Sequence, residues 1–156
     1  MTERKTKGDL EQMAEKIFEL SKLASAIRAQ NRAGIPEVLS ETEFLTLDVL
    51  IQEGPMTVGA IQRRIGVLPA QMSRIIRSLE NKGGRRFVEC TIHPSDRRKI
   101  DVQVTPKGRN GHRAYRSARL KMTTEILQDL TPEDRRQFVR ICGRIRSGMS
   151  KRAHRE

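Results

Sequence analysis

Residues 66–80 read GVLPAQMSRIIRSLE and decide how the middle of this 156-residue chain folds. Gly66 ends one short helical run and Pro69 begins the next, because a proline in the first turn of a helix loses no hydrogen bond. Beyond Pro69 the apolar residues recur at steps of three and four, which predicts a helix with one buried face. These apolar residues are Met72, Ile75, Ile76 and Leu79. Two short helices joined by a tight turn are typical of a helix-turn-helix.

The opposite face of the second predicted helix is polar and carries no carboxylate. It presents Ala70, Gln71, Arg74, Arg77, Ser78 and Asn81. A solvated helix face usually mixes charges of both signs, so a face with arginines and no acid favours a polyanion as partner. The alternative is that the two arginines only make the helix more soluble.

The charge of the whole chain points the same way. Lys and Arg number 31 against 19 Asp and Glu, a net charge of +12, and residues 54–110 hold twelve basic but only four acidic side chains. Such an excess concentrates polyanions near the surface, so nucleic acid is the leading partner. A membrane surface is the weaker one, because only 3% of the residues are aromatic.

Other classes of function are disfavoured by what the sequence lacks. No stretch is apolar for the roughly 18 residues that a membrane span needs, so we expect a soluble, cytoplasmic protein. The sequence has no glycine-rich phosphate loop, no paired carboxylates, and no Ser or Cys with an evident His partner. We therefore predict that the protein is not an enzyme and uses no cofactor or metal. The alternative of a zinc site at Cys90 and His93 with His112 lacks a second ligand cluster.

A β-hairpin is predicted directly after the helix-turn-helix. Residues 87–92 and 99–105 both alternate between apolar and polar side chains, which is typical of half-buried strands. The expected matching faces are Val88, Cys90 and Ile92 on one strand and Ile100, Val102 and Val104 on the other. The basic tip between the strands, HPSDRR at 93–98, makes this hairpin a wing that can reach a second groove of DNA.

Helices are also predicted before and after this central part. Ser40 and Glu43 form a capping-box pattern, with Leu39 and Phe44 as the hydrophobic staple, and Thr57 caps a further short helix. Glycine 83 is a candidate for the residue that ends the helix begun at Pro69.

The two ends of the chain are expected to be helical as well. Apolar residues at steps of three and four run from Leu10 to Ile27, and Gly34-Ile35-Pro36 ends this helix. Its narrow stripe fits a coiled-coil-like contact with another helix, in the same chain or in a partner copy, or alternatively the core of its own domain. Two more helices begin at Pro106 and Pro132. We predict a mainly α fold with a small β-hairpin wing: a winged helix-turn-helix at 39–105 between dimerisation helices at 1–38 and 106–149, and a disordered basic tail at 150–156.

Two motifs carry a resemblance to a known family. Ser95-Asp96-Arg97-Arg98-Lys99 is followed by Val104-Thr105-Pro106-Lys107-Gly108-Arg109, and residues 66–74 provide a turn and the start of a recognition helix. In these motifs and in its order of elements, the chain resembles the MarR family of bacterial transcription regulators. The resemblance implies a homodimer that binds double-stranded DNA at a pseudo-palindromic operator. It also implies a repressor that a small-molecule effector relieves; the alternative is a nonspecific or architectural nucleic-acid-binding protein.

The resemblance also assigns candidate DNA contacts. The recognition helix would offer Ala70, Gln71, Ser73, Arg74, Arg77 and Ser78, and the wing would offer Asp96, Arg97, Arg98 and Lys99. Gln71 suits adenine, and Arg74 or Arg77 suits guanine, although either arginine can instead hold a phosphate. Arg98 is the candidate for a narrow minor groove. Asp96 either pairs with Arg98 across the tip or only forms the turn.

Some positions depart from the family pattern. Leu68 stands where a Ser or Thr cap is common, so either the helix starts elsewhere or its first N–H groups are free for a phosphate. Compared with the family pattern, Gly84-Arg85-Arg86 resembles an insertion of three residues between the recognition helix and the wing. Relatives often have arginines on the first wing strand, and we expect Arg85 and Arg86 to contact phosphates in their place. Cys90 and Cys142 are both predicted to be buried and unreactive.

Overall fold

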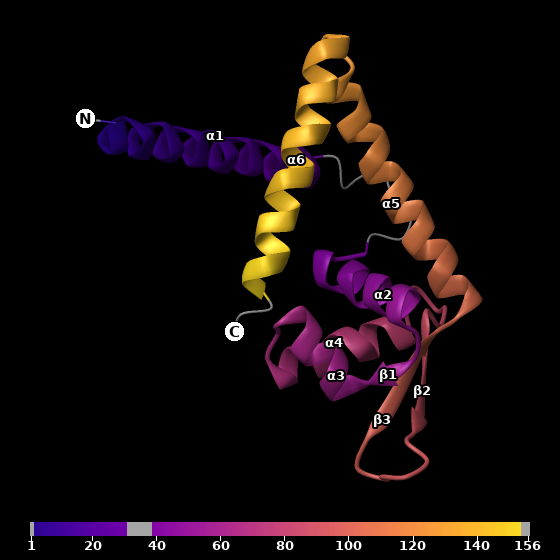
Figure 1. The fold of residues 1–156 in the computed structure, drawn as a ribbon. Helices are drawn as coiled ribbons and strands as arrows, with labels where there is room; N and C mark the ends of the chain where they lie inside the picture. The colour runs from indigo at the N-terminus through magenta and orange to yellow at the C-terminus, as the bar shows by residue number, and fades with distance from the viewer. Residues whose placement is uncertain (1, 31–38, 154–156) are drawn as a thin grey trace. The chain divides into compact units, whose positions relative to one another are not determined.

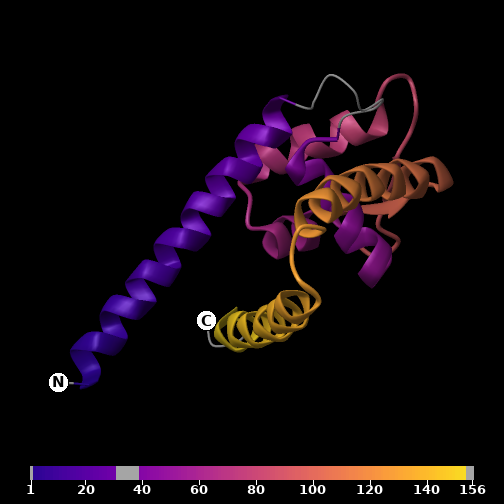
Figure 2. The same cartoon turned by 90° about the horizontal axis from the view of Figure 1, so that it is seen from above.

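The computed structural model describes residues 2–30 and 39–153, in two units divided after His112. Figures 1 and 2 show the elements. Helix α1 (Thr2–Gln30) is one continuous helix that exposes its apolar stripe, including Leu10 and Ile17. The predicted end of this helix at residues 34–36 lies outside the described residues.

The central lobe is a winged helix-turn-helix, as predicted. Along the chain it contains α2 (Glu41–Glu53), β1 (Met56–Thr57), α3 (Val58–Ile65), α4 (Pro69–Glu80), β2 (Val88–Ile92) and β3 (Ile100–Val104). The strands form an antiparallel sheet in the order β1-β3-β2. Figure 1 shows the β2–β3 hairpin, the wing, extending beyond α3 and α4.

The predicted matching faces of the wing strands are confirmed, and the structure adds their register. Val88 pairs with Val104, Cys90 with Val102, and Ile92 with Ile100. These faces are buried near the base of the wing, whereas Ile92 and Ile100 at its far end are exposed. Strand β1 was not predicted; its two residues pair with β3 and attach the helices to the wing.

Local capping interactions set the helix boundaries. The Ser40 hydroxyl accepts the N–H of Glu43 at 3.2 Å, and the Glu43 carboxylate accepts the N–H of Ser40 at 2.7 Å, so the capping box is complete. Thr57 caps α3 in the same way. Gly66 ends α3 in the left-handed region at a φ of 76°, where glycine is favoured. Helix α4 begins at Pro69, and Leu68 before it provides no side-chain cap.

The core of the lobe lies between α2, α3, α4 and the sheet. Its largest fully buried apolar side chains are Leu39, Leu47, Leu50, Ile61, Met72, Leu79, Phe87, Val88 and Val102. Most of them come from the helical stripes and strand faces that the sequence predicts. Burial of these side chains stabilises the lobe by roughly 1.5–3 kcal/mol each before the entropy of folding is counted.

The segment between α4 and β2 differs from the prediction. Helix α4 ends at Glu80, with Asn81 at its C-cap, so Gly83 does not end the helix. Instead, Gly83 and Gly84, with φ of 57° and 75°, form a tight turn in which Lys82 and Arg85 exchange two backbone hydrogen bonds. Positive φ at both central residues is typical of a two-residue hairpin turn.

Close packing joins the base of the wing to the start of α5 (Pro106–Leu127). The Thr105 hydroxyl accepts the N–H of Gly108 at 3.0 Å and donates to the Arg86 carbonyl at 2.7 Å, and the Thr105 N–H donates to the Phe87 carbonyl at 3.0 Å. Gly108 lies directly against that carbonyl: a Cβ atom there would be only 2.1 Å from the Phe87 oxygen. The close approach therefore requires glycine.

The second unit contains the rest of α5 and helix α6 (Pro132–Ala153). Thr131 accepts the N–H of Asp134 at 3.2 Å, which gives α6 the predicted start. Two predictions are wrong here. Cys142 is exposed and not buried, and residues 150–153 continue the helix where we expected a disordered tail. The remaining residues of that tail, 154–156, lie outside the described residues.

Within the described part of the chain, no helix is both long and apolar enough to cross a membrane.

Candidate nucleic-acid interface

Helix α4 separates an apolar buried face from a basic exposed face. Its buried residues are Met72, Ile75, Ile76 and Leu79, and its exposed residues include Ala70, Gln71, Ser73, Arg74 and Arg77. This division is the one predicted from the sequence. The Ser73 hydroxyl donates to the Pro69 carbonyl one turn earlier at 3.1 Å. The exposed face therefore presents two arginines, one glutamine and no carboxylate.

Ser78 does not share this exposed face. It is half-buried, and its hydroxyl donates to the carboxylate of Glu43 in α2 at 2.5 Å. The sequence-based expectation that Ser78 points outward is therefore wrong, because the side chain contacts the lobe's own core polar group. Ser78 is therefore a weaker candidate for a DNA contact than the exposed polar residues of α4.

The wing tip is organised around Asp96. The Asp96 carboxylate accepts the backbone N–H of Arg98 at 3.1 Å, and it lies 3.5 Å from the Arg98 guanidinium and 3.4 Å from the Lys99 ammonium. The Arg98 N–H, followed by these two side chains, holds the pKa of Asp96 below its usual value. Asp96 thus forms the turn and also pairs with Arg98, so both roles that the sequence suggested for it are present in the structure.

The basic side chains of the wing tip remain accessible although Asp96 contacts two of them. The Arg98 side chain is 93% exposed, and Arg97 and Lys99 are exposed beside it. Asp96 orients the guanidinium of Arg98, which is otherwise exposed to solvent. Such a side chain is suited to entry into a narrow minor groove, where the electrostatic potential is strongly negative.

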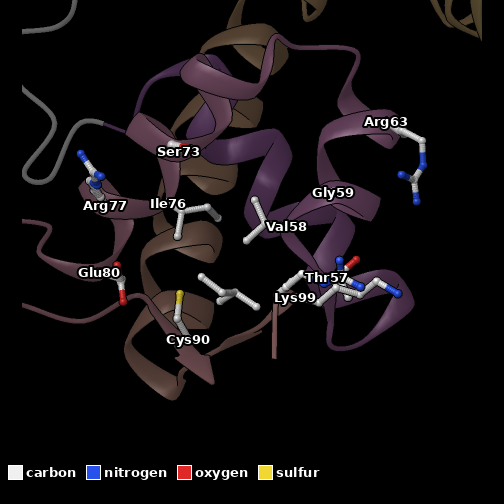
Figure 3. A pocket seen from close by; sticks show the side chains of 12 residues that line it. Thr57, Val58, Gly59, Arg63, Ser73, Ile76, Arg77, Glu80, Cys90 and Lys99 are labelled. Atoms are coloured by element: carbon white, nitrogen blue, oxygen red, sulfur yellow. The ribbon is translucent and has the colours of Figure 1, made fainter. Parts of the chain in front are cut away.

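A hollow of about 590 Å³ lies between α3, α4 and the wing; basic groups from all three line it, together with the carboxylate of Glu80. Figure 3 shows Arg77 on one side of this hollow and Arg63 and Lys99 on the other, with Val58 and Ile76 between them. Arg98 also lines it. Basic residues of α4 and of the wing therefore border the same hollow.

Arg85 and Arg86 lie in the segment between α4 and β2. Both are exposed, and they follow the Gly83-Gly84 turn. Arg86 and Arg77 line a second hollow, of about 500 Å³, together with the acidic residues Glu80 and Glu89. The second hollow therefore holds charges of both signs, whereas the exposed face of α4 carries no carboxylate.

The surroundings of Cys90 make its thiol unreactive. It is half-buried on β2, and burial together with the adjacent Glu80 carboxylate raises the pKa of its thiol to about 12. Only the thiolate is a nucleophile or metal ligand, so Cys90 is a poor candidate for either role.

His112, the third residue of the zinc alternative, has other contacts. It stacks on Phe44 with ring centroids 4.6 Å apart, and its Nε2 lies 2.8 Å from the Asp48 carboxylate. Among the residues that the structure describes, no group of three or more His, Cys, Asp or Glu is placed to hold a metal ion.

One feature of the lobe could not be predicted from the sequence, the part-buried polar cluster of Glu43, Ser78 and Lys82. Glu43 was assigned only to the cap of α2. Its carboxylate also receives Ser78 from α4 and, at 2.7 and 2.8 Å, the ammonium of Lys82. The partners are 35 and 39 residues away, and no local pattern could have indicated them.

Comparison with known proteins agrees with this geometry. A family model described as the MarR family matches residues 39–100. An uncharacterised HTH-type transcriptional regulator of Mycobacterium leprae is 37% identical over 119 residues, which cover 76% of this chain and 78% of that protein. The chain belongs to the MarR family. It is therefore a DNA-binding transcriptional regulator, as the sequence motifs indicated.

Solved structures show the same fold. The FabT protein of Streptococcus pneumoniae in complex with DNA is 20% identical with a TM-score of 0.69, and the match covers 90% of this chain and 97% of FabT. BpsR of Bordetella bronchiseptica, whose DNA binding is regulated by 6-hydroxynicotinic acid, is 22% identical with a TM-score of 0.59, and the match covers 83% of this chain and 98% of BpsR.

The close contact at Gly108 gives a physical reason for one MarR-like motif in this chain. In Thr105-Pro106-Lys107-Gly108-Arg109, threonine caps α5, proline occupies its first turn, and glycine admits the Phe87 carbonyl. The motif therefore fixes the base of the wing against α5 and gives the hairpin that carries the basic tip a rigid base.

Proposed function

We propose that this MarR-family protein acts as a homodimer that represses transcription by binding a pseudo-palindromic operator in double-stranded DNA. Each α4 would enter a major groove, and each wing would reach the flanking minor groove. Repression would end when a small-molecule effector binds. A regulator of this kind works in the cytoplasm, where its DNA is.

The observation that carries the proposal is that the carboxylate-free exposed face of α4 and the basic wing tip border the same hollow. Gln71, Arg74 and Arg77 lie exposed on one helix face, and Arg98 of the wing lines the same hollow as Arg77. A helix of this kind fits the major groove, which displays a distinct hydrogen-bonding pattern for each base pair.

The candidate contacts divide by role. Gln71, Arg74 and Arg77 would meet base edges, with Ala70 and Ser73 beside them close to the DNA. Arg97, Arg98 and Lys99 of the wing would meet the minor groove and its phosphates, while Asp96 orients Arg98. Arg85 and Arg86 would hold phosphates next to the recognition helix. Phosphate contacts position the protein, and base contacts select the sequence.

Exposed apolar side chains at both ends of the chain support dimer formation. On α1 they include Leu10, Met13, Ile17 and Leu20, and on α6 they include Phe138, Ile141, Ile145 and Met149. Stripes of this size on otherwise charged helices are typical of protein interfaces. A dimer would also supply the two-fold symmetry that a palindromic operator requires.

Selection of duplexes from a random pool tests the proposal. The protein should enrich a pseudo-palindrome with half-sites about one helical turn apart. At one fixed salt concentration, it should bind this duplex at least about 10³-fold more tightly than a scrambled duplex of the same composition. Equal affinity for both duplexes would instead favour a nonspecific or architectural role, and a monomer in light scattering would contradict the dimer.

A screen of small carboxylates and phenols against the selected duplex tests the effector. FabT bound to DNA and BpsR regulated by 6-hydroxynicotinic acid support a regulator of this type. An effector should lower affinity for the operator more than affinity for scrambled DNA. If no compound in the screen changes operator binding, constitutive repression replaces the ligand-relieved form of the proposal.

A further inference from the structure

The residue that couples α2 to the recognition helix is Glu43. Its side chain is almost completely enclosed, with the residue 4% exposed. One carboxylate oxygen accepts the N–H of Ser40 at 2.7 Å, the other accepts the hydroxyl of Ser78 at 2.5 Å, and the Lys82 ammonium lies within 2.8 Å of both. One carboxylate thus joins the start of α2, the last turn of α4 and the turn that follows α4.

The cluster is electrostatically complete. Burial by itself raises the pKa of Glu43, but hydrogen bonds from Lys82, Ser78 and Ser40 outweigh burial and bring this pKa below its usual value. Glu43 is therefore ionised at neutral pH. Its charge is favourable at the N-terminus of α2 and unfavourable at the C-terminus of α4, where Lys82 compensates for it.

Two other hydrogen bonds also hold the last turn of α4: the Leu79 carbonyl accepts the N–H of Phe87 at 2.8 Å, and the Glu80 carboxylate hydrogen-bonds with Cys90. The apolar contacts of α4 with the lobe are less directional. Met72, Ile75, Ile76 and Leu79 pack against apolar neighbours, and dispersion contacts of this kind do not fix an orientation as a hydrogen bond does. The N-terminus of α4 begins after Leu68 without a side-chain cap. The hydrogen bond from Ser78 to Glu43 is thus a directional constraint on the rotation of α4 about its axis.

We propose that Glu43 is a positioning residue for DNA recognition: through Ser78 it fixes the rotation of α4 and so aims Gln71, Arg74 and Arg77 at the base edges. The inference rests on the proposed function. Hydrogen bonds to base edges require the protein groups to lie within about 0.5 Å and 10–20° of the productive geometry. A small rotation of α4 therefore loses contacts with bases but keeps contacts with phosphates. Glu43 then acts on sequence selectivity more than on general affinity for DNA.

The test compares affinity for the selected duplex with affinity for the scrambled duplex at one salt concentration. Ser78→Ala removes the hydroxyl but leaves the cap of α2 and the Lys82 pair in place. It should lower the ratio of the two affinities by about 5- to 150-fold, the loss of one bidentate base contact, with affinity for scrambled DNA unchanged. Ser78→Thr keeps a hydroxyl and should restore the ratio. An unchanged ratio in Ser78→Ala would overturn the inference.

A double-mutant cycle separates positioning from a direct DNA contact by Ser78. Glu43→Gln cannot accept all three donors, so it should lower the same ratio, and Ser78→Ala should add little in the Glu43→Gln background. Losses that multiply would mean that Ser78 meets DNA independently, which overturns the inference. Should Glu43→Gln not fold, the Ser78→Ala and Ser78→Thr pair still decides the result.

Ser40→Ala is the matched control. It removes the hydroxyl that caps α2 and lowers the free energy of unfolding, but it leaves the Glu43 carboxylate and Ser78 untouched. The ratio should therefore stay at its wild-type value, and an equal fall would show that the ratio reports only general destabilisation. If the wild-type chain selects no duplex, the proposed function fails; if it selects one and Ser78→Ala behaves like wild type, only the inference fails.

Discussion

Gly108→Ala should destabilise the protein through one contact between α5 and the base of the wing. The new Cβ atom would lie 2.1 Å from the carbonyl oxygen of Phe87 and 2.9 Å from its carbon, and both atoms belong to the backbone. A flexible side chain could move aside, but here α5 or the strand must shift. The Phe87 side chain is almost fully buried, so the strand has little freedom.

The size of the effect follows from three contributions. Overpacking costs about 1–3 kcal/mol. Replacing glycine within a helix offsets about 0.5–1 kcal/mol of this cost. A shift of α5 also weakens the hydrogen bonds of Thr105 to Arg86 and Phe87, worth about 0.5–1.5 kcal/mol each. We expect the free energy of unfolding to fall by about 2–4 kcal/mol.

Urea unfolding followed by circular dichroism measures this change, at one fixed protein concentration because association also stabilises the fold. Gly143→Ala in α6 is the matched control: its Cβ atom would meet nothing within 4 Å. This variant should gain about 0.5–1 kcal/mol from helix propensity alone. A Gly108→Ala protein as stable as the wild type would refute the argument from close packing.

Other predictions concern the interface and the thiol of β2. Arg74→Ala should cost about 1–3 kcal/mol of operator binding and relax the preference at one base pair; uniform weakening on all sequences in a binding selection would reassign Arg74 to a phosphate. Arg98→Ala should weaken binding mainly where the flanks of the operator are A·T-rich, since their minor groove is narrow and negative, and equal losses with G·C-rich flanks would exclude insertion. Because the pKa of Cys90 is raised to about 12, its thiolate is scarce below that pH, and alkylation at pH 8 should be much slower than that of the exposed thiol in α6. Mass spectrometry of peptides distinguishes the two thiols, and rapid labelling of Cys90 in the folded protein would contradict its assignment.

Elements that depend on local patterns could be predicted from the sequence. The capping box at Ser40 and Glu43, the end of α3 at Gly66 and the matching apolar faces of the wing strands all follow from spacing within a few residues or from simple alternation. The basic exposed face of α4 also followed, because its opposite face is apolar at helical spacing.

The features that were missed depend on contacts between distant segments or on very short ones. Strand β1 has two residues, too few for a period of two to be visible. The roles of Ser78 and Lys82 depend on Glu43, which the fold brings beside them from another helix. Gly83 was assigned to a helix end because single glycines often occur there; the pair with Gly84 makes a hairpin turn instead.

Cys142 shows a third reason for error. Its position in the apolar stripe of α6 predicts burial, and the stripe itself is correct, but the described chain leaves this side exposed. A periodic pattern identifies which side of a helix is apolar without stating whether the same chain or another copy covers it.

The pairing of Asp96 with its own loop bears on how salt should affect DNA binding. A carboxylate already engaged by neighbouring donors repels an approaching phosphate less than a free one does. A cation already held by a carboxylate neutralises a phosphate less effectively, so it releases fewer of the counterions condensed on the DNA. Arg64 is held by Glu53 and Lys82 by Glu43. The slope of affinity against ionic strength should therefore follow the cations without such internal partners, and the formal charge of +12 is a poor guide to it.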